Sequence, residues 1–384
     1  RCLRFKSIAL YKKEAIAVGW EKRYYVGMKL LIVTQAVDTS DPILGFFHGW
    51  LLEFARQCES VEVICLRGGK HDLPENVRVH SLGKLHHEKS LFIDSVRYSL
   101  RFLFYIIRFA PRYDVVFVHM NAEYVLAGAF IWKLLRKRIA LWYTHKSTPL
   151  KLRFSVPLAN QIFTASAESF RIHSSKVLVT GHGVDTDLFD APRMPRKDHL
   201  HLITVGRFSR SKNIEVLLDA VKELPRRGVP YRFTVVGNAV TADDRRYRDE
   251  IIRKTSDSGL GAWVTFAGEK NNSDIPELLS SADVFLHAST TGSLDKALLE
   301  AMSERCTVLS SNDAARPILE KIDRRLSLKS ESTFFAAAIQ KVYEMDEGER
   351  AKISEALRAV VVAEHSLRHL ITKILWTLSQ QQSK

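Results

Sequence analysis

The chain has 384 residues, 46% of them hydrophobic, and its formal net charge is +14. This length is too great for one ordinary hydrophobic core and predicts two domains of a soluble globular protein. The positive charge predicts anionic partners such as sugar nucleotides or anionic lipid, while the absence of zinc-finger spacing, an Arg-rich tail and an aromatic RNA-binding signature argues against nucleic acid. The four cysteines are sparse and lack metal spacing, which indicates a reducing, cytoplasmic setting.

Residues 1–27 show no steady hydrophobic periodicity, whereas a strand pattern begins at Met28. We therefore interpret 1–27 as an extension of doubtful origin. Trp20, Tyr24 and Tyr25 stand among basic residues there, so a membrane-touching arm is the alternative.

Strand and helix patterns alternate through residues 28–192, which predicts an N-terminal domain with a parallel sheet. We expect a helix to open at Asp41 and to run to about Gln57, so that the loop carrying Asp41 lies at the carboxyl edge of the sheet. Strands are predicted at 30–37, 61–66, 77–81, 114–119, 138–145, 161–166 and 176–180.

Residues 89–112 mix basic with aromatic and aliphatic side chains. The run is too short and too charged to span a bilayer. Two compatible interpretations remain: a helix that packs on the sheet with basic edges, or an interfacial helix on anionic lipid.

Two histidines, His119 and His145, end neighbouring predicted strands. The carboxyl ends of parallel strands meet at one edge of a sheet, so both imidazoles are expected to face one cleft. A structural role and a site role remain equally open for them.

Residues 190–199 have linker composition and predict a domain boundary. A C-terminal domain, 200–362, repeats the alternating pattern, and residues 363–384 include a predicted terminal helix.

A first motif lies at 202–212. A short buried strand ends at Gly206, and Arg207 and Lys212 follow it beside the start of a predicted helix. A guanidinium and an ammonium at this edge would suit a diphosphate, and the alternative is a pair of solvated surface cations.

A second motif lies at 289–302, after a predicted strand at 283–287. Ser293 is expected to cap a helix that starts at Leu294, and the amides around Gly292, Ser293 and Leu294 would form a second anion site. Glu300, two turns into that helix, would bind ribose hydroxyls, or else is an ordinary exposed helical residue.

Together, Gly206-Arg207-x4-Lys212 and Gly292-Ser293-x6-Glu300 resemble the donor motifs of retaining glycosyltransferases of family 4, which have the GT-B fold. The resemblance implies an α/β architecture of two Rossmann-like domains that face each other across a cleft, with the terminal helix packed back on the N-terminal domain. This sequence departs from the family pattern at one position, because Gly292 stands where the family usually has a first Glu that contacts the transferred sugar. A subgroup with a similar Gly-Ser-Leu-Asp-Lys form is known.

By the same resemblance, His119, Arg207 and Lys212 are the expected catalytic residues. Asp41 and His145 are acceptor-side candidates. The expected donor-binding set is Gly206, Arg207, Lys212, Gly268, Gly292, Ser293, Leu294 and Glu300.

The implied reaction moves a sugar from a nucleotide-diphosphate sugar to a hydroxyl of a glycan or lipid-linked glycan, without a metal or other cofactor. The implied location is cytoplasmic, peripheral on the inner face of the membrane. The rival interpretations are a sugar-nucleotide epimerase on the same fold and a non-catalytic nucleotide-sugar-binding protein.

Overall fold

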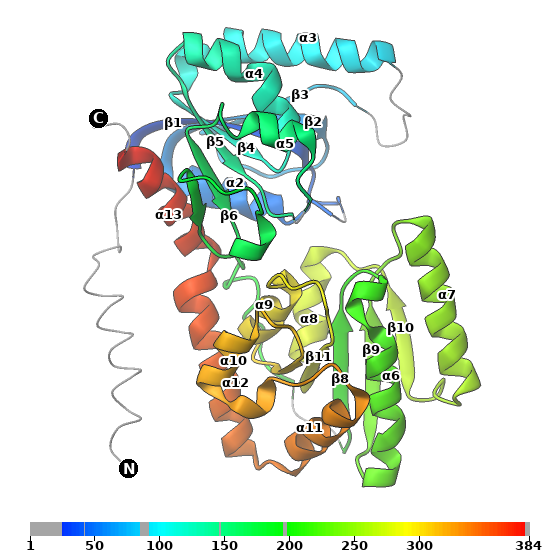
Figure 1. Cartoon of the computed structure of the whole chain (residues 1–384). Coiled ribbons are helices and arrows are strands. Elements are labelled where there is room, and N and C mark those ends of the chain that lie inside the picture. The colour runs from blue at the N-terminus through cyan, green and yellow to red at the C-terminus, as the bar shows by residue number, and fades with distance from the viewer. Residues whose placement is uncertain (1–24, 42, 85–91, 146, 195–197, 381–384) are drawn as a thin grey trace, which may run out of the picture.

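The structure is a computed structural model that describes residues 25–41, 43–84, 92–145, 147–194 and 198–380. It contains one sheet of seven strands and one of five, and in both every pairing is parallel (Figure 1). The predicted α/β architecture of two Rossmann-like domains is confirmed.

The N-terminal sheet has the strand order β3-β2-β1-β4-β5-β6-β7. The strands are β1 (Tyr25–Val37), β2 (Cys58–Gly68), β3 (Val77–Ser81), β4 (Val115–His119), β5 (Arg138–Trp142), β6 (Gln161–Thr164) and β7 (Val177–Val179). The helices of this half are α2 (Phe47–Gln57), α3 (Phe92–Arg108), α4 (Ala122–Leu134) and α5 (Leu150–Ser155).

Different helices cover the two faces of this sheet. One core contains side chains of α2 and of the terminal helix α13 (Leu367–Gln380), and the other contains side chains of α3, α4 and α5. β1, in the middle of the sheet, alternates between them, with Leu30 and Ile32 in the first core and Leu31 and Val33 in the second. This alternation follows from the two-residue repeat of a strand that is buried on both faces.

The C-terminal sheet has the order β10-β9-β8-β11-β12 and one continuous core. The strands are β8 (Leu200–Val205), β9 (Tyr231–Val236), β10 (Val264–Gly268), β11 (Val284–His287) and β12 (Thr307–Ser310). The helices are α6 (Ile214–Glu223), α7 (Ala242–Asp257), α8 (Ile275–Ser280), α9 (Lys296–Ser303), α10 (Arg316–Ile322), α11 (Ser332–Glu344) and α12 (Glu347–Val360).

The chain returns to the first domain at its end. A π-helical turn, η7 (Val361–His365), leads from α12 into α13, which contacts α2 and β1 (Figure 1). Val184 and Ser366 form a parallel bridge where the two crossing segments meet. A hydrogen bond of 3.0 Å from the Thr372 hydroxyl to the Gln57 side chain fixes the helix to α2.

Two predicted helix starts were wrong. The helix expected from Asp41 begins only at Phe47, because one carboxylate oxygen of Asp41 accepts hydrogen bonds from the Ile43 and Leu44 amides and folds a turn. The helix expected from Leu294 with Ser293 as its cap begins at Lys296, so Glu300 lies about one turn into it.

The predicted first strand was too short at its amino end. β1 begins at Tyr25, and its register with β2 shifts between Tyr25 and Lys29, a stretch that includes Gly27 at φ +100°. Residues 1–24 lie outside the described residues, so the interpretation of the amino-terminal segment as an extension stays a prediction. Among the described helices, none combines the length and the apolar character needed to cross a bilayer.

Candidate functional site

Three glycines lie together at the carboxyl edge of the C-terminal sheet. The amide of Gly206 donates to the Val236 carbonyl at 3.0 Å, and the amide of Gly237 donates to the Gly268 carbonyl at 2.9 Å. A Cβ atom on Gly237 would lie 1.8 Å from the Gly206 carbonyl oxygen, so no side chain fits there. The bare backbone of three neighbouring strand ends is thereby exposed to a ligand.

The two motif loops are tied to each other. The Thr290 amide donates to the Ser211 carbonyl at 2.8 Å, and Lys212 Nζ lies 2.6 Å from Asp295 Oδ2. These contacts place the loop that follows β8 beside the loop that precedes α9. The structure thus brings together Gly206, Arg207 and Lys212 with Gly292, Ser293, Leu294 and Glu300.

Asp295 is the centre of a charged network that the sequence did not reveal. Its Oδ2 also accepts a hydrogen bond from His287 Nε2 at 2.7 Å, and His287 Nδ1 lies 2.9 Å from the Ser310 hydroxyl. Burial alone would raise the pKa of Asp295, but the His287 hydrogen bond and the Lys212 charge outweigh it and hold that pKa well below its usual range. Burial lowers the pKa of His287, and the nearby Asp295 opposes that shift.

Because Asp295 is ionised, it can only accept hydrogen bonds, so the proton of a neutral His287 sits on Nε2. Nδ1 then accepts from Ser310. Asp295 is the residue that precedes α9, yet its side chain makes no capping hydrogen bond, since its Oδ2 is engaged by Lys212 and His287. The first amides of α9 therefore have no side-chain cap.

Arg207 is exposed, and within the described residues its guanidinium has no hydrogen bond or ion pair, although its charge acts on Asp244. It differs in this from Lys212, whose side chain is 21% exposed and already paired with Asp295. Of the two predicted cations, one is thus held by the protein and the other is open to an anion.

Glu300 is buried, with 6% of its surface exposed. Its Oε1 lies 2.8 Å from Lys296 Nζ, but the two groups are not aligned as a hydrogen bond, and among the described residues this oxygen has no hydrogen-bond partner. This buried oxygen has a cation beside it but accepts no hydrogen bond among the described residues, so it can still accept one from a ligand.

Lys296 also reaches the other domain. Its Nζ lies 4.6 Å from the centre of the Phe46 ring, which comes just before α2. This cation–π contact places the Glu300 carboxylate directly beside the N-terminal domain. Lys296 was missed in the sequence, although its four-residue spacing to Glu300 on one helix was a usable signal.

Gly292 has φ +68°, a left-handed conformation that a residue with a Cβ atom adopts only with strain. The backbone here is therefore built for glycine and would disfavour a glutamate. Asn312 supports the same loop, because its Nδ2 donates to the carbonyls of Ser293 at 3.2 Å and Ser289 at 3.4 Å.

On the N-terminal side, His119 ends β4 and is only 3% exposed. Its ring stacks on Phe47 at 4.2 Å and lies 5.8 Å from the Trp50 ring, and its Nδ1 is 3.3 Å from the Thr34 hydroxyl. Burial lowers the pKa of His119 to about 3, so the imidazole is neutral at physiological pH. It can exchange hydrogen bonds but carries no charge.

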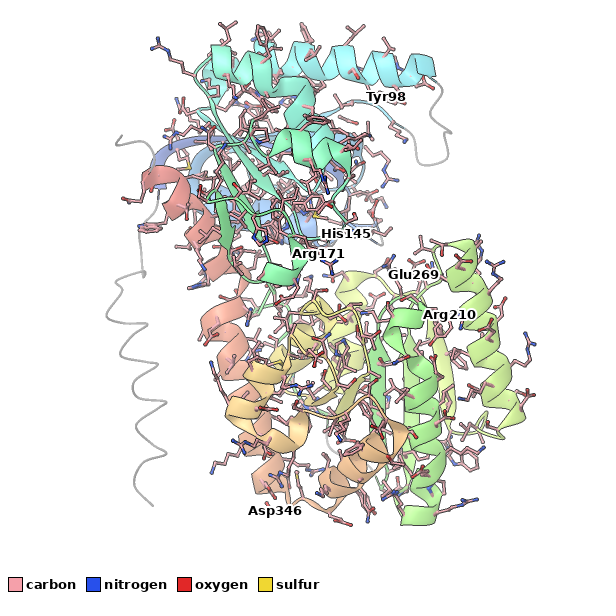
Figure 2. All side chains as sticks on the ribbon, viewed as in Figure 1. Tyr98, His145, Arg171, Arg210, Glu269 and Asp346 are labelled. Atoms are coloured by element: carbon pink, nitrogen blue, oxygen red, sulfur yellow. The ribbon has the colours of Figure 1, made fainter. Side chains whose placement is uncertain are left out.

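The two acceptor-side candidates differ in exposure. Asp41 is buried, and its Oδ2 forms an ion pair of 2.7 Å with Arg67. His145 is exposed, three residues beyond the end of β5, with Nδ1 2.7 Å from the Ser147 hydroxyl. Figure 2 shows His145 and Arg171 on the edge of the N-terminal domain that faces the C-terminal domain, with Arg210 and Glu269 on the opposing edge.

A further histidine lies at the chain crossing. Burial lowers the pKa of His182 to about 4, a shift that a hydrogen bond to the Leu294 backbone opposes, and Lys296 and Asp295 are close enough to act on its charge. In the part of the chain that the structure describes, no cluster of three or more His, Cys, Asp or Glu side chains could hold a metal ion.

Comparison with known proteins adds to this geometry. Residues 186–360 match the sequence model of the family "Glycosyl transferases group 1". The putative colanic acid biosynthesis glycosyltransferase WcaL of Escherichia coli K12 is 28% identical over 219 residues, 53% of this chain and 51% of that protein. The capsular polysaccharide biosynthesis glycosyltransferase CapH of Staphylococcus aureus is 25% identical over 270 residues, 65% of this chain and 72% of that protein.

The alignment thus spans about half the length of the first of these relatives. Among solved structures, Anabaena HepE in complex with UDP has a TM-score of 0.69 at 18% identity and covers 92% of this chain and 100% of its own. Sucrose-phosphate synthase from Thermosynechococcus elongatus has a TM-score of 0.69 at 16% identity, with 92% and 99% covered. Residues 186–360 therefore match the glycosyl transferases group 1, and the described part of the chain has the GT-B fold of these solved proteins.

Proposed function

We propose that this protein is a retaining glycosyltransferase of family 4, which moves a sugar from a nucleotide-diphosphate sugar to an acceptor hydroxyl. The observation that carries the proposal is the buried Glu300 carboxylate on α9, whose Oε1 accepts no hydrogen bond among the described residues. The loop before α9 is bonded to the loop that carries Arg207 and Lys212. Two ribose hydroxyls would supply donors to Glu300, and the cations would meet the diphosphate.

In the reaction, the bond between the anomeric carbon and the diphosphate oxygen would break, and the diphosphate would leave with the electron pair. The acceptor hydroxyl oxygen would form the new bond to the anomeric carbon and give its proton to the departing phosphate. Arg207, Lys212 and the amides near Gly292, Ser293 and Leu294 would stabilise the negative charge that develops. The contact of Lys212 with Asp295 fixes the ammonium in place before the donor binds, which is the preorganisation that makes such groups effective. No metal is expected to take part, since these cations and amides would stabilise the leaving group in its place.

The neutral His119 would orient the sugar by hydrogen bonding and would not act as a nucleophile. Its burial among Phe47 and Trp50 fits such a role, because a fixed neutral ring positions a hydroxyl without attracting a second anion. On the acceptor side, Asp41 would shape its loop through Arg67, while the exposed His145 is free to contact the incoming glycan.

The named relatives act in colanic acid and capsular polysaccharide biosynthesis, and a solved protein of this fold binds UDP. These names support a glycan as the acceptor. A lipid-linked glycan as acceptor, and a cytoplasmic protein placed peripherally on the inner face of the membrane, are further parts of the proposal. The names also support a uridine nucleotide as the first donor to test.

The test is a panel of UDP-sugars and GDP-sugars, first by thermal shift and then with glycan and lipid-linked acceptors. A donor at one hundred times its dissociation constant should add about 2.7 kcal/mol of stability. Retention would appear in the anomeric proton coupling of the product, and activity should survive EDTA. A free epimer as product, or tight donor binding without transfer or hydrolysis across the panel, would overturn the proposal.

A further inference from the structure

Helix α3 is apolar on two opposite sides. Its inner side packs Tyr98, Phe102 and Ile106 into the core of the N-terminal domain. Its outer side exposes four apolar side chains at a spacing of four, four and three residues, which places them in one stripe along the helix. They are Val96, Leu100, Phe104 and Ile107, with 43%, 62%, 60% and 56% of their surfaces exposed.

The two helices beside α3 continue this surface. α3, α4 and α5 share one core on the same face of the sheet, and α4 contacts both of the others. Their outward sides expose Phe130 at 81%, Leu134 at 73%, Leu150 at 68% and Phe154 at 64%. We name these four residues and the stripe of α3 the outer face. Isolated exposed apolar residues are ordinary, but eight on three adjoining helices are not.

The charge around the outer face is strongly positive. Six basic side chains of α3, α4, α5 and the turn after α4 are exposed, and the two acidic ones there, Asp94 and Glu123, are paired with Arg97 and Lys151. The exposed basic residues are Arg97, Arg108, Lys133, Arg136, Lys151 and Arg153. By helical spacing, Arg97, Arg101 and Arg108 run along one edge of the α3 stripe. Arg101 is partly used by the fold, since its NH1 donates to the Leu82 carbonyl at 2.7 Å, whereas Arg108 is exposed.

We infer that the outer face docks on an anionic lipid bilayer, with its apolar side chains at the boundary of the acyl chains and its arginines among the headgroups. Aromatic and aliphatic side chains edged by arginine are suited to the depth at which headgroups meet hydrocarbon. A symmetric contact between two copies would instead bring the same positive charges face to face, which charge repulsion disfavours.

The position of the outer face fits this partner. α3, marked by Tyr98, lies on the side of the N-terminal domain remote from the C-terminal domain (Figure 2). Docking there leaves the site loops and the C-terminal domain in water, open to a soluble donor. The sequence drew attention to residues 89–112 alone, and the contributions of α4 and α5 emerge only from the fold. The inference names a lipid surface and does not depend on the donor chemistry.

The experiment is co-sedimentation of the full chain with phosphatidylglycerol-containing and pure phosphatidylcholine vesicles, at 0.1 and 0.5 M salt. Wild type is expected to bind the anionic vesicles, and salt should weaken that binding. The double variant L100S/F104S tests the apolar stripe, with F334S as a control for an exposed phenylalanine in the C-terminal domain, 40% exposed. R97Q/R108Q tests the edge charges, with R226Q/R253Q as its charge-matched control on exposed C-terminal arginines.

Both outer-face variants should lower the partition coefficient at least tenfold, while both controls stay within twofold of wild type. Hydrolysis of a soluble donor should be unchanged in every folded variant, so a failed glycosyltransferase proposal and a failed membrane inference remain distinguishable. Equal binding of all variants, or no binding to anionic vesicles, would overturn the inference. A concentration-dependent dimer that L100S/F104S abolishes, without vesicle binding, would assign the outer face to self-association instead.

Discussion

Replacing Lys212 by Met removes the one predicted cation that the protein itself holds in place. The ammonium lies 2.6 Å from Asp295 Oδ2, with its side chain 21% and that of Asp295 17% exposed. Asp295 keeps His287 as a partner after the change, so we expect only about 1 kcal/mol of lost stability from this partly screened pair. The fold should survive.

The catalytic effect should be larger than the effect on stability. If Lys212 faces the leaving diphosphate, removal of one preorganised donor raises the barrier by about 3 kcal/mol, or roughly a hundredfold in turnover. Lys212→Arg keeps the charge and should retain more activity than Lys212→Met. The loss of the lysine charge should also raise the pKa of His287, since Lys212 now lowers it.

The assay is donor turnover at saturating donor and acceptor, with urea unfolding of each variant and a histidine titration by NMR. Lys222→Met, on the exposed side of α6, is the matched control and should behave as wild type. A folded Lys212→Met enzyme with wild-type turnover would refute the proposed role of Lys212 at the leaving diphosphate. An unchanged titration of His287 would show that the charged network described for Asp295 does not exist in solution.

Three further changes test other parts of the site. Glu300→Gln should weaken donor binding at least tenfold, because an amide offers the ribose only one acceptor oxygen and no charge. Calorimetry measures this affinity, and an unchanged value would exclude Glu300 from the donor site. Gly292→Glu should lower the free energy of unfolding by about 1–2 kcal/mol because φ is +68°, and a thermal midpoint equal to wild type would contradict that strain. Between about pH 6.5 and pH 3, His119 binds a proton in the unfolded state but not in the folded state. The free energy of unfolding should therefore decrease by about 1.4 kcal/mol for each unit by which the pH is lowered in that window. His119→Gln should therefore lose about 2 kcal/mol less than wild type between pH 7 and 5 in urea titrations, and equal losses would show that His119 is accessible to protons.

Local patterns were sufficient for the architecture. The alternation of apolar strands and amphipathic helices predicted the parallel sheets, since each buried strand and its following helix are encoded within about thirty residues. The helix starts expected at Asp41 and Leu294 were wrong for different reasons: the neighbouring Ile43 and Leu44 amides close a turn on Asp41, whereas partners distant in sequence engage the side chain before α9. Arg67 occupies one oxygen of Asp41, and Lys212 and His287 hold the Asp295 side chain that precedes α9.

The site was predictable in part for the same reason. The grouping of Gly206, Lys212 and Glu300 could be predicted from spacing, because the residues proposed for the diphosphate and the ribose lie in two short segments, 202–212 and 289–302. The contact of Lys296 with Phe46 joins residues 250 positions apart and has no local signature. The departure at Gly292 was visible as a missing glutamate, but its physical reason, a left-handed backbone, required coordinates.

The return of α13 has a consequence for biosynthesis. Six apolar side chains of this helix, Leu367, Leu370, Ile371, Ile374, Leu375 and Leu378, belong to the core that α2 and β1 share. The N-terminal domain thus cannot complete its own interior until residues 367–378 have been translated. A nascent chain arrested before residue 367 should expose that unfinished surface to chaperones and proteases, even though all seven strands of its sheet have already emerged.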